Sequence, residues 1–293
     1  MVARALPAKA ARPLVLDSPH SGRLYPADFN HSVSRRSLHR MEDGFVDLVF
    51  DDTPQQGVAF IHARFARSYI DPNRAEHDLD PQMIDGPWPG AAPSNKSALG
   101  VGLIFRRNLD GAPIYTAPLP VDQVRHRIEA YYRPYHRLLA ATLAATERRF
   151  GAVWHLNCHS MPACAAAPAH HGRQESHRAD FCLGDLHGKS CDPRFTQTVA
   201  RRLTSMGYRV SINEPYAGAE LIRRYGDPAT GRHSLQIEIN RALYMDERLH
   251  RPHDGLRPLR RSMNRLVAAL ADDLGADDLG ADDLSGYPVL AAE

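Results

Sequence analysis

Short apolar runs that end in turn-forming residues alternate along this chain with longer runs in which apolar residues recur every three or four positions. The short runs have the length and flanking residues of buried strands, and the longer runs have the period of helices that bury one face. Strands are predicted at "PLVLDSPHSG", "GAVWHLNCHSMPA", "ADFCLGD", "YRVSINEPY" and "GRHSLQIEINRALYM", and a strand pair at "GVAFIHARFARSYIDPNR". This alternation predicts an α/β fold whose sheet is covered by helices on both faces.

Four longer runs are predicted to be helices. They span 35–52, 120–150, 192–207 and 255–275. In the second, Pro134 is expected to kink the helix, because proline removes a backbone donor. In the third, Asp192 is expected near the helix cap.

The chain shows no clear linker, so a single domain is predicted over residues 14–270. Residues 1–13 are expected to be a basic tail, because they carry basic residues and no acid. Residues 271–293 are expected to be a solvated acidic tail, because "ADDLGADDLGADDLS" is a low-complexity repeat.

Composition narrows the class of protein. The net charge of +2 over 293 residues, with scattered basic residues, gives no reason to expect a nucleic-acid partner. No apolar run approaches the roughly 20 residues that a membrane span needs. The four cysteines form no C-x-x-C pair and are interpreted as free thiols of a cytoplasmic protein. Sixteen histidines raise the expectation of a metal site. The oligomeric state does not follow from the sequence.

Reactive side chains stand where the predicted strands end. They are His20 in "DSPHSG", the segment 71–74 in "YIDPNR", His159 in "NCHSMP" and Glu238 in "LQIEIN". Ligand sites of open α/β sheets lie at the carboxyl ends of strands. Two histidines and one carboxylate are a common hydrolytic zinc set. The acidic pair Glu42–Asp43 offers the carboxylate.

The segment "NCHS" also allows nucleophilic catalysis by Cys158 or Ser160. Neighbouring residues on a strand point to opposite faces, so neither side chain is placed to be activated by His159. No G-x-S-x-G elbow is present. A metal ligand at His159 needs no sequence neighbour, only convergence with other strand ends. Metal binding is therefore the favoured interpretation.

Seven motifs, in order, resemble those of the N-formylglutamate amidohydrolase (N-formylglutamate deformylase) family. They are "SPHSG", "EDGFVD", "SYIDPNR", "LNCHSMP", "LGDLHGKSC", "PYAG" and "HSLQIEINRALYM". The resemblance runs from about residue 14 to about residue 270. The family is similar to zinc carboxypeptidases and aspartoacylases. The resemblance therefore implies a zinc-exopeptidase-like α/β fold with a mixed, largely parallel sheet.

The resemblance also implies roles for individual residues. It places the metal on His20, Asp43 and His159, with Glu42 and Asp47 as rival carboxylates because Gly44 stands where the family carries an aromatic residue. Asn157 stands where many members carry an aspartate. Glu238 matches the general base of the related peptidases. Substrate-binding residues would be Arg67, Asp71, Asn73, Arg74 and Tyr216. Asp185, His187 and His233 are expected to orient the ligands or line the pocket.

The activity that the resemblance implies is hydrolysis of the formyl amide of N-formyl-L-glutamate to formate and L-glutamate, as a step of histidine breakdown. It would use one divalent metal ion, expected to be zinc, and a small-molecule N-acyl amino acid as substrate. Two alternatives stay open: an enzyme for another N-acyl amino acid or a short peptide, and a metal-binding relative without catalysis. Glu238 argues against the second alternative. Side-chain specificity is expected to depend on loops such as "MIDGPWPGAAPSNKSALG".

Overall fold

A seven-stranded sheet with the strand order β1-β3-β2-β6-β9-β7-β8 forms the centre of the computed structural model, which describes residues 1–9, 11–164 and 178–275. Strands β3, β2, β6 and β9 are parallel; β7 and β8 are parallel to each other but antiparallel to β9, and β1 is antiparallel to β3. The predicted mixed, largely parallel sheet is confirmed. The strands are Val2–Ala5 (β1), Leu14–Ser18 (β2), Ala59–Ala63 (β3), Val153–Met161 (β6), Phe181–Gly184 (β7), Val210–Ile212 (β8) and Arg232–Asn240 (β9).

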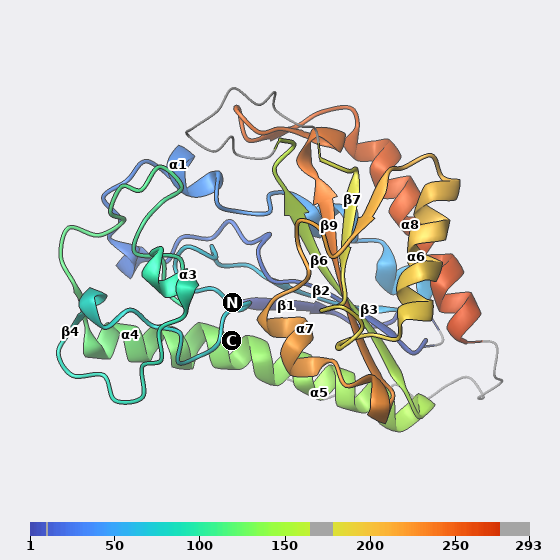
Figure 1. The fold of residues 1–293 in the computed structure, drawn as a ribbon, viewed down its shortest axis with the longest axis horizontal. Coiled ribbons are helices and arrows are strands. Elements are labelled where there is room, and N and C mark those ends of the chain that lie inside the picture. The colour runs from blue at the N-terminus through green and yellow to red at the C-terminus, as the bar shows by residue number, and fades with distance from the viewer. Residues whose placement is uncertain (10, 165–177, 276–293) are drawn as a thin grey trace.

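Helices cover both faces of this sheet (Figure 1). A long helical segment, α4 (Val121–Arg127) and α5 (Arg133–Phe150), lies on one face. On the other face lie α2 (Val46–Val49), α6 (Pro193–Ser205) and α8 (Leu256–Leu274). The two apolar layers follow from strands whose side chains alternate between the faces, so that both faces need cover.

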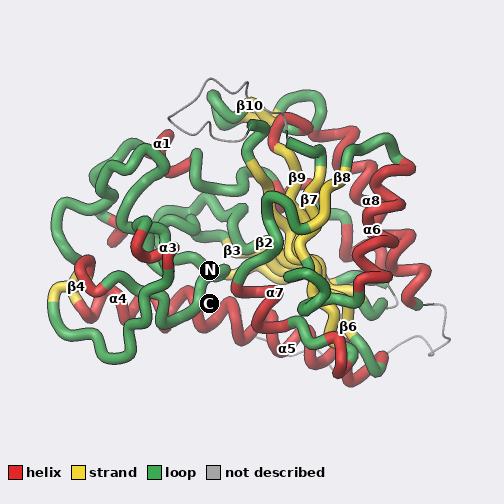
Figure 2. Tube along the Cα trace, viewed as in Figure 1, coloured by secondary structure: helices red, strands yellow, loops and turns green. Residues whose placement is uncertain are grey.

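Several of the shorter elements lie to one side of the sheet, in a region made mostly of loops (Figure 2). The short helices are α1 (Arg35–His39), α3 (Asn95–Ala98) and α7 (Glu220–Tyr225). Two small strand pairs lie outside the central sheet. Strand β4 (Ile84–Asp85) pairs in parallel with β5 (Leu119–Pro120), and β10 (Met245–Asp246) pairs antiparallel with β11 (Arg251–Pro252). Single 3₁₀ turns lie at Ala27–Phe29, Thr53–Gln56, Pro81–Met83, Pro228–Thr230 and Arg241–Leu243.

Strand β6 places polar groups on one face and apolar groups on the other. Leu156 and Cys158 belong to the apolar layer under α6 and α8. His155, Asn157 and His159 alternate with them and are almost fully buried. A buried parallel strand that carries three polar side chains on one face must give each of them a hydrogen-bond partner. These partners form the base of the site described below.

Two predicted elements are different in the structure. The helix predicted over 35–52 is broken into α1 and α2, because the chain between them turns back to donate the Asp43 amide to the His20 carbonyl (3.1 Å). At this turn a Cβ on Gly44 would lie 2.7 Å from the His250 ring. The strand pair predicted over 57–74 is one strand, β3, because the later amides bond to other loops, as Asp71 does to Leu103.

Three further expectations concern the helices and termini. A π-helical turn, Ile128–Tyr132, lies immediately before Pro134, where a kink was predicted, and the helix continues beyond it. Asp192 caps α6 by accepting from the Arg194 amide, as predicted. The expectation of a basic tail is wrong for Val2–Ala5, which pairs with β3. Of the predicted acidic tail, residues 276–293 lie outside the described residues. No helix among the described residues is long and apolar enough to cross a membrane.

Candidate active site and metal centre

His20, Asp43 and His159 converge at the carboxyl ends of β2 and β6. His20 follows β2, His159 lies near the end of β6, and Asp43 comes from the turn between α1 and α2. Asp43 Oδ2 lies 3.3 Å from Nδ1 of His20 and 2.9 Å from Nδ1 of His159. One ligand atom from each residue lies within 4.8 Å of the others, and all three residues are buried. The structure therefore brings together the three residues predicted from the sequence.

The three side chains fit a divalent metal ion. Ligands about 2.0–2.1 Å from a tetrahedral zinc ion lie about 3.3 Å from one another. The two distances from Asp43 Oδ2, 3.3 and 2.9 Å, are close to that spacing. Two imidazoles and one carboxylate are also the donor set of hydrolytic zinc sites, which keep one position for water.

The rival carboxylates point elsewhere. Glu42 accepts a hydrogen bond from the Tyr25 hydroxyl, and its other oxygen lies 3.9 Å from Nε2 of His250. Asp47 is paired with Arg23 at 2.6 Å. Neither approaches His20 or His159 in any hydrogen bond of the described residues, so Asp43 is the carboxylate that geometry favours.

Asp71 holds the outer nitrogen of His20. Its Oδ1 lies 2.6 Å from Nε2 of His20, and Arg67 donates to its Oδ2 at 2.7 Å. Burial raises the pKa of Asp71, but the charges of Arg67 and His20 outweigh burial and hold this pKa well below its ordinary value. A carboxylate on the far nitrogen of a histidine leaves the near nitrogen free as a ligand. Asp71 thus lies behind His20, whereas the sequence resemblance implied contact with substrate.

Asn157 holds the outer nitrogen of His159. Its Nδ2 donates to Asp17 Oδ1 at 2.6 Å, so its Oδ1 faces Nε2 of His159 at 2.7 Å. This contact favours the tautomer of His159 with its proton on Nε2, in which Nδ1, the nitrogen facing Asp43, would be free to bind a metal ion. Burial lowers the pKa of His159 despite the nearby Asp43, which favours the neutral imidazole that a metal needs.

Glu238 lies beside His159 on the neighbouring strand. The register of β6 and β9 pairs the two residues, so both side chains project from the same face of the sheet. Gln236 donates from Nε2 to one Glu238 oxygen at 3.0 Å. Burial, reinforced by the charge of Asp43, raises the pKa of Glu238 to about 8. A carboxylate with a raised pKa beside a candidate metal is suited to proton transfer.

A cavity of about 450 Å³ lies over these groups. His20, Asp43, His159 and Glu238 line it, together with Arg67, Asn73, Arg74 and Tyr216 from the predicted substrate-binding set. Arg74 donates from Nε to the Val101 carbonyl (3.0 Å) and from Nη1 to the Asn73 carbonyl (2.9 Å), which holds its guanidinium in place. The Nδ2 group of Asn73 lies 3.2 Å from Nε2 of His159. The cavity thus combines the candidate metal ligands with fixed cationic and amide donors.

Arg241 is a site residue that the sequence reasoning missed. It follows β9 and donates to Asp43 Oδ1 (3.1 Å), to the Glu42 carbonyl (2.7 Å) and to Ser160 Oγ (3.0 Å). These bonds hold the Asp43 turn against β6. Arg241 lies within the motif "HSLQIEINRALYM", but no spacing rule connects it to a residue 198 positions away.

Asp185, His187 and His233 do not contact the candidate ligands. Asp185 bonds to Asn213, Thr196 and the Gly188 amide after β7, and His187 is exposed. His233 stacks on Trp154 at the start of β9, five residues before Glu238. Asp185 and His233 instead make local packing and turn-forming contacts.

Cys158 is excluded as a nucleophile. It is fully buried in the apolar layer opposite His159, and burial raises the pKa of its thiol well above the ordinary value. A reactive cysteine needs an accessible thiolate. The prediction that Cys158 and His159 diverge is confirmed.

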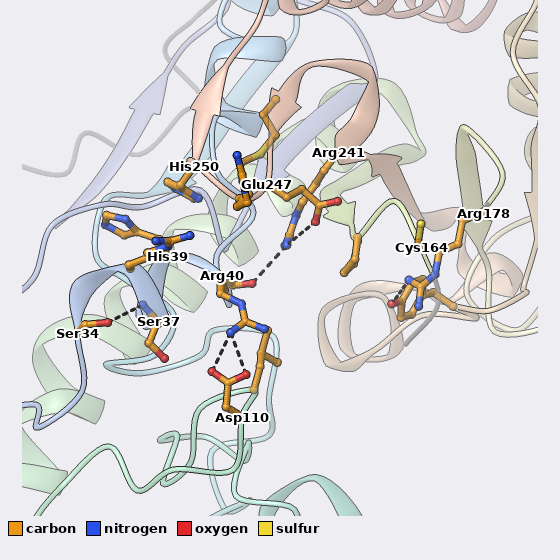
Figure 3. Close-up of a pocket in the computed structure, with 16 residues that line it drawn as sticks. Ser34, Ser37, His39, Arg40, Asp110, Cys164, Arg178, Arg241, Glu247 and His250 are labelled. Carbon is orange, nitrogen blue, oxygen red and sulfur yellow. Dashed lines mark hydrogen bonds and ion pairs between the residues drawn. The ribbon is translucent and has the colours of Figure 1, made fainter. Parts of the chain in front are cut away.

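A second cavity, of about 880 Å³, adjoins the first and shares Arg40, Tyr216 and Arg241 with it. Figure 3 shows Arg40 bound to both oxygens of Asp110, while Arg241 reaches the Arg40 carbonyl. The two arginines at the boundary are therefore held by protein groups.

Comparisons with known proteins agree with this site. The family description N-formylglutamate amidohydrolase matches residues 12–245. An N-formylglutamate deformylase of Pseudomonas aeruginosa is 29% identical over 244 residues, covering 80% of this chain and 83% of the relative. One from Pseudomonas putida is 28% identical over 243 residues, covering 80% and 82%.

Solved structures agree as well. The crystal structure of N-formylglutamate amidohydrolase from Ralstonia eutropha is 42% identical, with a TM-score of 0.88 over 94% of this chain and 98% of that one. A protein of Agrobacterium tumefaciens, 19% identical with a TM-score of 0.59 over 92% and 95% of the two chains, shares the fold. Because the family description spans most of its length and this solved relative nearly all of it, the chain belongs to the N-formylglutamate amidohydrolase family.

Proposed function

We propose that this protein is a metal-dependent amidohydrolase that cleaves N-formyl-L-glutamate to formate and L-glutamate. Membership in the family supports the reaction class, and relatives carry the name N-formylglutamate deformylase. The observation that carries the proposal is the set His20, Asp43 and His159 facing one cavity with Glu238. Its place in histidine breakdown and in the cytoplasm stays a prediction.

His20, Asp43 and His159 would hold one divalent ion, expected to be zinc. Such an ion supplies an acidified water and a positive charge for the scissile carbonyl. Each of these three residues is oriented by a hydrogen bond on the side away from the ion: His20 by Asp71, His159 by Asn157 and Asp43 by Arg241.

Glu238 would move the proton. Its carboxylate takes the proton of the attacking water and returns it to the amine nitrogen as the amide bond breaks. Gln236 keeps the carboxylate oriented at the cavity. The raised pKa makes the Glu238 carboxylate a stronger proton acceptor than that of an exposed glutamate, and the positive charge of a bound metal ion would keep it ionised near neutral pH.

Asn73 and Arg74 would bind the α-carboxylate of the substrate. Asn73 lies next to His159, and Arg74 follows it in the chain. The α-carboxylate and the formamide nitrogen share one carbon, so the α-carboxylate must lie near the metal ligands. A guanidinium held by two backbone carbonyls presents its remaining N–H groups in a fixed direction, which suits a planar carboxylate.

Formate release from a panel of N-formyl amino acids, combined with metal analysis, tests the proposal. We expect about one metal ion per chain and the highest kcat/KM for N-formyl-L-glutamate. His159→Ala should lose metal and activity together. Glu238→Gln should keep the metal but lower kcat by roughly 10²–10⁴-fold. Metal retention and full activity in His159→Ala would overturn the metal assignment, and a preference for another N-formyl amino acid would overturn the substrate.

A further inference from the structure

The cationic side chains that line the catalytic cavity are not equally free to bind an anion. Arg67 is paired with Asp71, Arg241 with Asp43, and Arg40 with Asp110. Arg74 has two of its donors on backbone carbonyls. Lys96 also lines the cavity, yet no hydrogen bond or ion pair joins its ammonium group to any residue in the described ranges. Its charge is therefore available to a ligand.

Lys96 is tied to Arg74 through one residue. The Val101 amide donates to the Lys96 carbonyl at 2.8 Å, and the Val101 carbonyl accepts from Nε of Arg74 at 3.0 Å. Desolvation and the positive charges of Arg74 and Arg67 lower the pKa of Lys96, in accord with the three cationic side chains lining the same cavity. A cluster of like charges costs energy unless an anion joins it.

The short helix α3, which carries Lys96, is held by a buried aspartate. Asp78 accepts from the Ser94 amide (2.8 Å), the Ser94 hydroxyl (2.9 Å) and the Ser97 hydroxyl. The Ser94 hydroxyl caps α3 by accepting from the Lys96 amide at 3.0 Å. A helix of one turn is not stable alone. These contacts therefore fix the place of Lys96 at the cavity.

We propose that Lys96 binds the side-chain carboxylate of the substrate and makes this enzyme selective for an acidic N-acyl amino acid. The inference rests on the proposed function. N-Formylglutamate carries two carboxylates, and its side-chain carboxylate is separated from the formamide nitrogen by more bonds than the α-carboxylate. Arg74, close to the metal ligands, takes the α-carboxylate, and Lys96, on the short helix α3, takes the side-chain carboxylate. A lysine supplies a mobile point charge, which suits the flexible end of the substrate.

Two substrates of the same shape test this inference. N-Formyl-L-glutamate and N-formyl-L-glutamine differ by the side-chain charge. We expect Lys96→Met to lower kcat/KM for the glutamate substrate by roughly ten-fold or more, mainly through KM, and to leave the glutamine substrate within about three-fold. Metal content should not change. Lys189→Met, the same substitution at an exposed lysine away from the cavity, is the matched control and should affect neither substrate.

An equal loss on both substrates, or no loss on N-formyl-L-glutamate, would overturn the role of Lys96. Wild-type enzyme that releases formate from neither substrate would overturn the proposed function instead. In that event, calorimetry of L-glutamate and L-glutamine binding to the zinc-loaded protein tests the role of Lys96. Lys96→Met must then weaken glutamate binding alone; equal binding of both ligands by the wild type contradicts the inference.

Discussion

Arg74 is the residue whose side-chain chemistry can be tested most directly. Its guanidinium is held by the Val101 and Asn73 carbonyls beside the catalytic cavity. Arg74→Lys keeps the charge but loses this fixed planar fork. We expect kcat/KM to fall about 10- to 100-fold, the effect of removing a charge-assisted hydrogen bond worth about 1.5–3 kcal/mol. Steady-state kinetics and metal analysis on the same samples measure it.

Metal content should stay the same in Arg74→Lys, because Arg74 contacts no candidate ligand directly. Arg133→Lys, at an exposed arginine paired with Glu76, is the control. A substrate amidated at its α-carboxylate should no longer distinguish wild type from Arg74→Lys. If kcat/KM for this amide still differs ten-fold between wild type and Arg74→Lys, Arg74 supports the structure of the site rather than binding the α-carboxylate.

His136 is a buried histidine that links stability to pH. It is bonded to the Tyr225 hydroxyl (2.8 Å) and the Pro72 carbonyl (3.0 Å). Burial, with the charge of Arg224, lowers its pKa from 6.5 to about 4. The folded state therefore disfavours the protonated ring. The stability that this pKa difference contributes to the folded state is fully present above pH 6.5. It is lost as the pH falls toward 4, because the unfolded chain takes up the proton first.

For the wild type, we expect the His136 linkage to remove on the order of 2 kcal/mol of unfolding free energy between pH 7 and pH 5. Urea unfolding at the two pH values measures this change. His136→Gln cannot titrate, so its stability should change less over the same interval, even if it is lower throughout. Equal pH dependence of the two proteins would show that His136 is not the titrating group.

At the scale of elements, the turn after β2 depends on a glycine. A Cβ on Gly22 would lie 2.2 Å from the Phe65 carbonyl oxygen and 2.5 Å from the Arg64 carbonyl carbon. Because both are backbone atoms, the turn must move. The Leu24 amide donates to the Arg64 carbonyl in the same place, so the turn that carries His20 is held against the residues after β3.

Gly22→Ala is therefore expected to lower the free energy of unfolding by about 1–3 kcal/mol, the cost of overpacking, and to weaken zinc binding. Chemical unfolding and zinc titration measure the two effects. Gly90→Ala is the control, because a Cβ at this position meets nothing within 4 Å. Since Gly90 has a φ of +83°, this substitution should lower the free energy of unfolding by about 1 kcal/mol but leave the zinc affinity unchanged. Unchanged zinc affinity in Gly22→Ala would contradict the link between this turn and His20.

At the scale of the whole molecule, the candidate metal centre joins segments distant in sequence. The end of β2, the turn between α1 and α2, and the end of β6 each contribute one ligand. A ligand that binds the folded chain raises its stability by mass action, about 2.7 kcal/mol at a hundred-fold excess over Kd. We therefore expect a chelator to lower Tm by several degrees and abolish activity, and zinc to restore both.

Thermal scans with chelator, and with zinc added back, measure this effect. His159→Ala, which lacks one ligand, should show a Tm that responds little to either addition. A wild-type protein whose Tm and activity are indifferent to chelation would contradict the metal centre.

The sequence by itself determined the alternation of strands and helices, the covered faces of the sheet and the residues at strand ends. Periodicity reports which side chains of one element share a face, and a buried run that ends in a polar residue marks where that residue is delivered. His20, His159 and Glu238 were found in this way. The opposed directions of Cys158 and His159 follow from the same rule.

Only the tertiary structure decided which groups meet across long separations. Of the neighbouring acids at 42, 43 and 47, Asp43 alone faces the two histidines, because the backbone turns between α1 and α2. Asp71 lies behind His20, and Arg241 reaches back 198 positions to Asp43. Side-chain directions in loops have no fixed period, so contacts such as these depend on how the loops pack against the sheet and not on spacing along the chain.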